Sequence, residues 1–428
     1  MTSLGFDFGT TNTVLSIKSG NGTKSLNFVS SGGRTDTMRT CLSFMKDKDL
    51  GAAALKVDAG AAAIRTFIDN PGESRFLQSI KTFAASPLFQ NTAVFGRRMA
   101  FEDLMEAFLR QLMVYAGDEW PSNVTRIVAG RPVRFAGINA NEGLALERYN
   151  AALSRFGFPE VQFVLEPVAA SFYFAETLTQ DANVLVADFG GGTSDYSIIR
   201  FERIAGKLHA TPIGHSGVGV AGDMFDYRIV DHVVSPLIGK GSHFKSFGKL
   251  LDIPSNYYAN FARWNQLSIF KTTRDFADLQ DIVRFAVEPE KLERFVELIE
   301  DDEGYPLYQA VAKTKMALSG ADETEFYFAP LGADSRKVVR RADFESWIED
   351  DLAQMANALD EAVDNAGLAA SDIDKVFLTG GTSFVPAVRR IFTDRFDASR
   401  IESGGELLSI AHGLALIGER DDATAWAA

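Results

Sequence analysis

The chain has 428 residues, 46% of them hydrophobic, so it is long enough to form several domains with substantial cores. Its 43 basic and 57 acidic side chains give a net charge of −14, which disfavours non-specific binding to nucleic acid or to anionic membranes. The single cysteine, Cys41, excludes an intramolecular disulfide, and no His/Cys spacing fits a structural zinc site. With neither a secretory leader nor an apolar run of about 18 residues, the sequence predicts a soluble, cytoplasmic protein.

The first predicted element is a hairpin near the N-terminus, and the same pattern recurs later in the chain. Residues 5–17 and 186–198 each contain an apolar run, an Asp-Phe-Gly unit, a turn with glycine and threonine, and a second alternating run. The two aspartates, Asp7 and Asp188, are too far apart for a solenoid repeat. We therefore predict a duplicated domain and two similar lobes.

Between the two copies, helical and strand-like patterns alternate. An amphipathic helix is predicted over residues 101–115, with Leu104, Phe108, Leu112 and Tyr115 on one face. A strand at 126–129, a helix at 141–156 and a strand at 161–165 follow. This order predicts an α/β fold. Residues 240–304 are rich in aromatic and then in acidic residues and are expected to be helical, and residues 233–249 show no clear strand.

Glycine-rich segments suggest phosphate binding, but one of them has the wrong context. Residues 217–222 match the G-x-G-x-x-G spacing of dinucleotide-binding loops, yet no acidic residue closes a following strand, so we reject that interpretation. A Walker A loop is absent. In the segments 7–11 and 188–193, glycines let backbone N–H groups face phosphate oxygens, and threonine hydroxyls add donors. A third glycine-rich site follows at 380–382.

The aspartate in each of the first two turns indicates a metal ion as well as a phosphate. A carboxylate fits beside phosphate when Mg²⁺ lies between them, because this ion prefers oxygen ligands and retained waters. The matched pair Asp7 and Asp188 therefore predicts one magnesium–nucleotide site. A general acid/base couple and ordinary turn aspartates remain open as alternatives.

Four motifs in this order resemble the nucleotide-binding half of DnaK-type heat-shock chaperones, members of the actin-like ATPase superfamily. Residues 6–12 and 187–195 are similar to the two phosphate loops, 165–171 to a Glu-Pro connecting segment and 376–386 to the adenosine motif. The resemblance implies an α/β, two-lobed actin-like fold, in which duplicated ribonuclease-H-like domains enclose a central nucleotide cleft.

The resemblance also implies a domain organisation. Lobe I would span residues 1–183 and lobe II residues 184–405, with an inserted helical subdomain at about 240–310. Residues 406–428 would contain a C-terminal helix that returns to lobe I. As in the short YegD-like proteins, we expect no peptide-binding domain after that helix and therefore no tight binding of extended peptides.

Individual residues receive roles from the same resemblance, in a site for ATP or ADP and Mg²⁺. Asp7 and Asp188 would hold the metal through water molecules. The catalytic residues would be Asp188, Thr193, Glu166 and Lys81, the last of which would orient the attacking water. A lone lysine is otherwise a solvated surface charge. Nucleotide contacts are implied for Gly9, Thr10, Thr11, Asn12, Gly190, Gly191, Gly192, Thr193, Gly222, Lys315, Met316, Ser319, Gly380, Gly381, Thr382 and Phe384.

The adenine pocket departs from the family pattern. Met316 and Phe384 stand where the family has arginines, so the base would rest between a thioether and a ring. The alternative is that both side chains are ordinary core residues.

The sequence thus predicts a slow, Mg-dependent ATPase of chaperone-like function that couples hydrolysis to lobe closure. A protein client or co-chaperone is left open as a partner, while nucleic acid and membranes are not expected. Two other classes remain. In a carbohydrate or acid kinase, Asp195 would activate a substrate hydroxyl, and phosphoryl transfer to an added small molecule would reveal this. An actin-like filament protein would sediment with ATP in a concentration-dependent manner.

Overall fold

The computed structural model describes residues 2–423 except 21, 48–53, 71, 137–138, 176–177, 205–206, 263–269, 272, 404–407 and 421–422. Its internal contacts divide the chain into two compact units. The first combines Met1–Gly222 with Asp351–Ala428, and the second is Asp223–Asp350. The lobe boundaries at residues 183 and 405 remain predictions, and most of the expected segment 406–428 beyond its helix lies outside the described residues.

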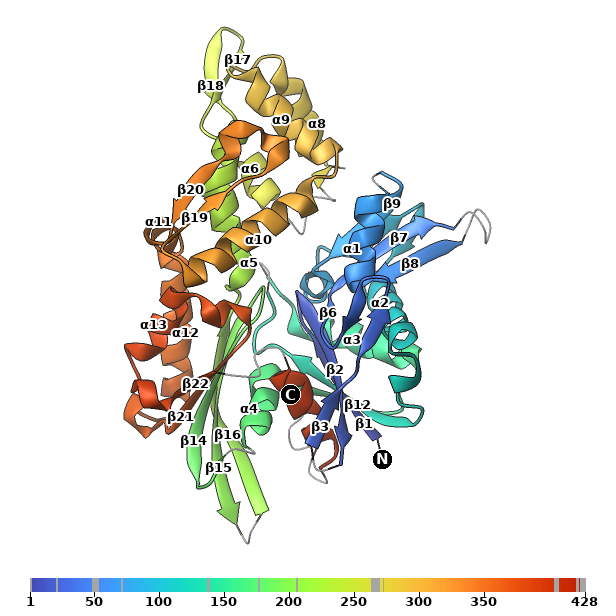
Figure 1. The fold of residues 1–428 in the computed structure, drawn as a ribbon, viewed down its shortest axis with the longest axis vertical. Coiled ribbons are helices and arrows are strands. Elements are labelled where there is room, and N and C mark those ends of the chain that lie inside the picture. Colours follow the sequence, from blue (N-terminus) through green and yellow to red (C-terminus); the bar gives the residue numbers. More distant parts are fainter. Residues whose placement is uncertain are drawn as a thin grey trace. The chain divides into compact units, whose positions relative to one another are not determined.

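Two sheets with the same strand order form the first unit (Figure 1). In each, an antiparallel meander of three strands is extended by two parallel strands. One sheet has the order β13 (Val161–Leu165), β12 (Val124–Arg131), β1 (Thr2–Phe8), β2 (Asn12–Ser19) and β3 (Gly22–Ser25). The other has the order β22 (Ile401–Ser403), β21 (Lys375–Thr379), β14 (Ala182–Phe189), β15 (Ser194–Ile204) and β16 (Lys207–Val218). The predicted duplication is therefore confirmed.

The helices of this unit follow the same duplicated plan. A helix precedes the first parallel strand of each sheet, a second lies between the two parallel strands, and a third follows them. In the first copy these are α2 (Phe101–Ala116), α3 (Glu142–Phe156) and α4 (Glu166–Ala175). In the second they are α12 (Glu349–Asn365), α13 (Pro386–Thr393) and α14 (Ser409–Gly418). The predicted helices at 101–115 and 141–156 and the strand at 161–165 are confirmed, although Tyr115 is only half-buried.

The helices α4 and α14 pack between the two sheets and share one apolar core with them. This core contains Val128 and Val164 of one sheet, Val186 and Phe377 of the other, and Leu414 of α14. The two helices approach closely at Gly413, where a Cβ atom would lie 1.7 Å from the carbonyl oxygen of Ala169. The two sheets of this unit are therefore joined by one continuous core.

Smaller elements surround the first sheet. Strand β6 (Met38–Arg39) pairs with β2. A small sheet contains β8 (Leu55–Ala59), β7 (Cys41–Lys46) and β9 (Ser74–Gln78). There are also two hairpins, β4 (Phe28–Ser30) with β5 (Gly33–Thr35) and β10 (Thr92–Val94) with β11 (Arg97–Met99), and the helix α1 (Gly60–Asp69).

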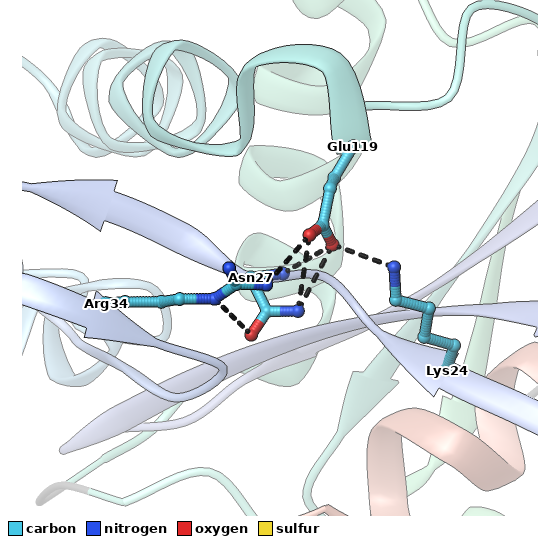
Figure 2. A network of polar contacts seen from close by, with 4 residues as sticks. All are labelled: Lys24, Asn27, Arg34 and Glu119. Atoms are coloured by element: carbon cyan, nitrogen blue, oxygen red, sulfur yellow. Dashed lines mark hydrogen bonds and ion pairs between the residues drawn. The ribbon is translucent and has the colours of Figure 1, made fainter.

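Figure 2 shows how Glu119, beyond the end of α2, binds three residues of the segment 24–34. Its carboxylate accepts hydrogen bonds from the backbone and side chain of Asn27 and pairs with Lys24 and Arg34. The amide of Asn27 and then Lys24 lower the pKa of Glu119 to about 2.

The second unit is mainly helical but also contains two hairpins. Its helices are α5 (Gly222–Ile229), continued by one π-helical turn at Val230–Val234, then α6 (Ser255–Ala262), α8 (Arg274–Val283), α9 (Pro289–Glu300), α10 (Gly304–Gly320) and α11 (Arg341–Trp347). The hairpins are β17 (His243–Ser246) with β18 (Lys249–Asp252), and β19 (Glu323–Phe326) with β20 (Lys337–Arg340). The expectation of no strand in residues 233–249 is therefore wrong. The turn of the first hairpin is made by Phe247 and Gly248, both with positive φ.

Among the helices that the structure describes, none is long and apolar enough to cross a membrane. Cys41 is a free, buried thiol.

Candidate functional site

The first glycine loop is a tight turn held by its own backbone and by Thr40. Asp7 and Phe8 end β1 and pair with Val14 and Thr13 of β2. A Cβ atom on Gly9 would lie 2.2 Å from the carbonyl oxygen of Asn12, so only glycine fits this turn. Thr40 donates its hydroxyl to the carbonyl of Gly9 at 2.8 Å. The loop residues 10–12 are partly exposed, which leaves Thr10 and Thr11 accessible to a ligand.

The second glycine loop occupies the equivalent place between β14 and β15. Asp188 pairs with Asp195 across this hairpin, and the amide of Gly190 donates to the carbonyl of Thr193 at 2.9 Å. Residues 190–193 are exposed or half-buried. The two loops therefore present the same groups, a buried aspartate at the strand end followed by accessible glycine amides and threonine hydroxyls.

The third glycine-rich segment packs directly against the second loop. Because β21 is parallel to β14, both strands end at the same edge of the sheet, with Thr379 beside Asp188. Gly380 has a φ of 81°, and a Cβ atom there would lie 2.1 Å from the carbonyl oxygen of Phe189. The carbonyl of Gly190 accepts two hydrogen bonds, from the hydroxyl of Thr382 at 3.2 Å and from the amide of Gly222 at 3.5 Å.

The fold brings the first and second loops together. A Cβ atom built on Gly192 would lie 3.6 Å from the hydroxyl oxygen of Thr10. A second link joins Asp195 to the chain beyond β12, because its Oδ1 accepts the amides of Val133 at 2.7 Å and Arg134 at 3.2 Å. The two hairpins, far apart in sequence, thus lie side by side.

Lys81 is buried and forms an ion pair with Glu166. Its Nζ lies 2.6 Å from Oε1 of Glu166, and both side chains are less than a tenth exposed. Lys81 lies on a short 3-10 helix, Ile80–Phe83, and Glu166 is the first residue of α4. Burial alone would lower the pKa of Lys81, but the carboxylate beside it outweighs this effect, and the pKa rises above its usual 10.5. The alternative of a solvated surface lysine is therefore wrong.

Around this ion pair lie three further buried carboxyl groups. Burial raises the pKa of Asp7 from 3.8 to about 8, with Glu166 adding to the shift and Lys81 opposing it. Burial also raises the pKa of Asp195 to about 7. For Asp188, burial and three neighbouring carboxylates raise the pKa well above 3.8. Four carboxyl groups thus share one ammonium group, and the cluster attracts positive charge.

The second unit contains three of the predicted nucleotide contacts, on α10. Lys315 donates to the buried carboxylate of Asp226 at 2.9 Å, and the hydroxyl of Ser319 donates to the carbonyl of Lys315 at 3.4 Å. Met316 is 72% exposed, and Phe384 in the first unit is 52% exposed. The alternative that these two are core residues is therefore wrong, because neither packs inward.

Several contributors to the site were missed in the sequence. Tyr149 of α3 is fully buried, and its ring packs edge-on against that of Phe8, the neighbour of Asp7. Thr40 closes the first loop, and the amides of Val133 and Arg134 hold Asp195. No local signal marks these residues, because each acts only through a contact made by the tertiary fold.

Comparisons with known proteins agree with this architecture. The family model described as "Hsp70 protein" matches residues 91–242 and 274–419, which is more than half of the chain. The chain belongs to the Hsp70 family. It is 25% identical to the chaperone protein DnaK of Deinococcus deserti and 25% identical to that of Deinococcus radiodurans, each over 96% of this chain and 58% of the relative. The chaperone protein DnaK of Cyanidioschyzon merolae is 24% identical over 91% of this chain and 57% of its own length.

This Hsp70-family chain therefore spans less than two thirds of the length of these curated relatives. Its mixed α/β architecture, with two sheets of the same order, is that of the two-lobed actin-like fold. The family model begins at residue 91, after Asp7 and Lys81, whereas the alignments to the DnaK proteins span nearly the whole chain.

A magnesium ion fits the donor set of this Hsp70-family site. Among the described residues, no three His, Cys, Asp or Glu side chains are grouped closely enough to ligate a metal directly. The buried carboxyl groups outnumber the one lysine, and Oδ2 of Asp195 is buried with no hydrogen-bond partner. These features suit a cation that keeps its waters and is held through them by Asp7 and Asp188.

We expect the metal-free protein to lose stability as the pH rises through the range set by Asp7. The folded-state pKa of Asp7 is about 8 and its ordinary value is 3.8, so the folded state binds the proton more tightly. Stability from this group is therefore fully present below about pH 4 and is lost as the pH rises to about 8. Asp7→Asn removes the ionisable group, so in EDTA it should raise Tm at pH 8, by roughly 2–4 °C per kcal/mol.

Thermal melts of the wild type and Asp7→Asn at pH 5 and pH 8 check this expectation. At pH 5 the two proteins should differ much less in Tm than at pH 8, because most of the stability lost through Asp7 is lost between pH 5 and about pH 8. An equal difference in Tm at both pH values would show that Asp7 is not the group responsible.

Proposed function

We propose that the chain binds Mg-ATP or Mg-ADP at the two hairpin loops and hydrolyses ATP slowly. The observation that supports this most is the close approach of Gly192 to Thr10 in loops whose aspartates belong to a buried cluster of four carboxyl groups and Lys81. Accessible glycine amides and threonine hydroxyls suit phosphate oxygens, and the carboxylates suit a hydrated cation. Family membership and the names of the relatives, chaperone proteins, point the same way.

In this proposal different residues bind the phosphates, support the loops, stabilise charge and accept the proton. Thr10, Thr11 and the amides of residues 190–193 bind and orient the phosphates, while Gly380 and Thr382 brace the second loop. When bound, Mg²⁺ would supply charge neutralisation on the phosphate oxygens. Lys81, held by Glu166, stabilises the charge of the transferring phosphoryl group and orients water. Asp195, with Oδ1 fixed by two amides and a pKa of about 7, is suited to accept a proton from that water.

The same proposal includes the two predicted lobes and a chaperone-like role. Lobe I, residues 1–183, and lobe II, residues 184–405, would close on the nucleotide, and Lys315 and Ser319 would face the nucleoside. A chaperone-like role with a protein client or co-chaperone, in the cytoplasm, would follow from coupling this closure to hydrolysis.

The proposal is tested by ATP turnover of the purified chain with Mg²⁺, in the presence and absence of an unfolded polypeptide. Release of phosphate at a slow basal rate supports the hydrolase. Stimulation by the polypeptide would extend it to a chaperone role. No phosphate release above a protein-free control, under either condition, would overturn the proposed activity.

A separate prediction concerns Phe384, whose exposed ring we propose as part of the adenine site. Phe384→Ala should weaken ATP and ADP binding alike by about twofold to tenfold, since aromatic stacking contributes roughly 0.5–1.5 kcal/mol. Binding of tripolyphosphate, measured by the same titration calorimetry, should barely change. The control is Phe247→Ala, which removes a fully exposed ring from a hairpin turn of the second unit. If Phe384→Ala binds ATP as tightly as the wild type, other residues hold the base.

A further inference from the structure

The loop that follows Lys81 has an unusual arrangement of carbonyl groups. Four backbone carbonyls of residues 83–89 point at a single guanidinium group, that of Arg148 on α3. Nη1 of Arg148 donates to Phe83, Ala84 and Ser86 at 2.8, 2.9 and 3.1 Å, and Nη2 donates to Phe89 at 2.6 Å. The carbonyl of Ala85, between them, accepts the amide of Asn141 at the start of α3 at 2.8 Å.

These bonds supply donors to carbonyl groups at and beyond the end of a short helix. The last carbonyls of a helix have no partner within it, and here the short helix Ile80–Phe83 ends at Phe83 and Ala84. A positive charge at a helix C-terminus is favourable, and the planar fork of arginine can serve several carbonyls at once. The carbonyls of Phe83 and Ser86 also accept the amides of Ser86 and Phe89, at 3.3 and 3.2 Å, whereas those of Ala84 and Phe89, in partly buried contacts, would lose the donor that Arg148 supplies.

Lys81 lies on the same short helix, so the hydrogen bonds of Arg148 also hold the backbone of the lysine in the ion pair. The amide of Ala84 donates to the carbonyl of Lys81 at 3.1 Å, and Ser79, just before the helix, has a φ of 51°. A residue other than glycine keeps such a conformation only when its surroundings enforce it. Tyr149, the neighbour of Arg148, packs its ring against Phe8 of the first glycine loop. Helix α3 thus binds the segment that follows Lys81 through Arg148.

We propose that Arg148 is a positioning residue for the hydrolytic step, acting through Lys81. The inference rests on the proposed function. Arg148 fixes the backbone on which Lys81 stands, so its loss displaces the ammonium group from the transferring phosphate. Its hydrogen bonds go to residues 83–89 and not to the glycine loops, so nucleotide binding should not depend on it. A displacement of about 1 Å can cost about 100-fold in rate.

The test compares Arg148→Ala and Arg148→Lys with Arg155→Ala in the full chain. Arg155 lies on the same helix and forms an ion pair with Asp103, with both side chains at least 40% exposed. Single-turnover hydrolysis, the Kd for ATP and hydrogen exchange of residues 80–89 are measured for each. Arg148→Ala should hydrolyse ATP at least about tenfold more slowly, with its Kd within about twofold of wild type. Arg148→Lys should fall between, and Arg155→Ala should match the wild type.

Two further measurements separate positioning from general damage. Guanidinium ion, far below its denaturing range, should restore part of the activity of Arg148→Ala by filling the vacated place. In a Lys81→Ala background, Arg148→Ala should lower the rate no further, because residues that act as a unit are not additive.

The inference would be overturned if Arg148→Ala lowered the hydrolysis rate by the same factor in the wild type and in the Lys81→Ala variant, or if ATP affinity fell in parallel with the rate. Arg148 would then be a structural residue. Unchanged exchange of residues 80–83 in Arg148→Ala would also overturn it, whatever the hydrolysis rates. A wild-type chain without ATP hydrolysis would instead overturn the proposed function and, with it, the catalytic part of this inference.

Discussion

Asp188→Asn is expected to lower the rate of ATP hydrolysis by about 100- to 10,000-fold, the equivalent of several kcal/mol of metal-assisted charge stabilisation. Asp188 ends β14 fully buried, beside three other carboxyl groups. Asparagine keeps the shape of the side chain but removes the negative charge that would hold a hydrated Mg²⁺. Asp7→Asn should have an effect of the same order, since Asp7 occupies the equivalent place in the first hairpin.

Initial rates of phosphate release, with protein folding checked by thermal melts, measure this effect. Asp334→Asn is the matched control, because the same change is made at a side chain that is 78% exposed in the second unit. If either Asp188→Asn or Asp7→Asn hydrolysed ATP at the wild-type rate, the two-aspartate site would be wrong.

Lys81→Ala is expected to reduce the hydrolysis rate by about 100- to 1,000-fold while sparing ATP binding. The reason is that a fixed positive charge near the phosphate stabilises charge that develops in the transition state more than charge in the ground state. The variant also leaves Glu166 buried without its partner, which can destabilise the fold by about 3–5 kcal/mol. Rate and stability must therefore be measured together.

A double variant separates these two effects. Lys81→Met with Glu166→Gln removes both charges, so it should recover much of the stability lost in Lys81→Ala but none of the activity. The control Lys56→Ala removes a lysine that is 53% exposed and should leave turnover unchanged. Parallel loss of ATP affinity and rate in Lys81→Ala would assign the lysine to ground-state phosphate binding.

The sequence predicts best those parts of the structure whose signal is local and repeated. The hairpins at residues 5–17 and 186–198 combine alternating apolar runs with small turn residues, and both form as expected. The hairpin of β17 and β18 was missed because its turn lacks the usual Asn-Gly or Asp-Gly pair and all four residues of β18 are exposed. No inside/outside alternation marks that strand.

Site geometry depends on contacts between distant positions, which one sequence does not reveal. Lys81 and Glu166 are separated by 85 positions, so the lysine could be taken for a surface charge until the fold paired them. Asp195 and Val133 are 62 positions apart, and the donor is a backbone amide that carries no side-chain signal. Met316 and Phe384 were open to a core interpretation because apolar residues usually pack inward, yet both are exposed.

The most direct test of the central claim is a calorimetric titration of the nucleotide-free chain with ATP, in Mg²⁺ and in EDTA. We predict one ATP per chain in Mg²⁺, markedly weaker binding in EDTA, and loss of this Mg²⁺ dependence when Asp7 and Asp188 are both replaced by asparagine. No binding in Mg²⁺, or the same affinity in Mg²⁺ and EDTA for the wild type, would contradict a site in which two hairpin aspartates hold a magnesium–nucleotide complex.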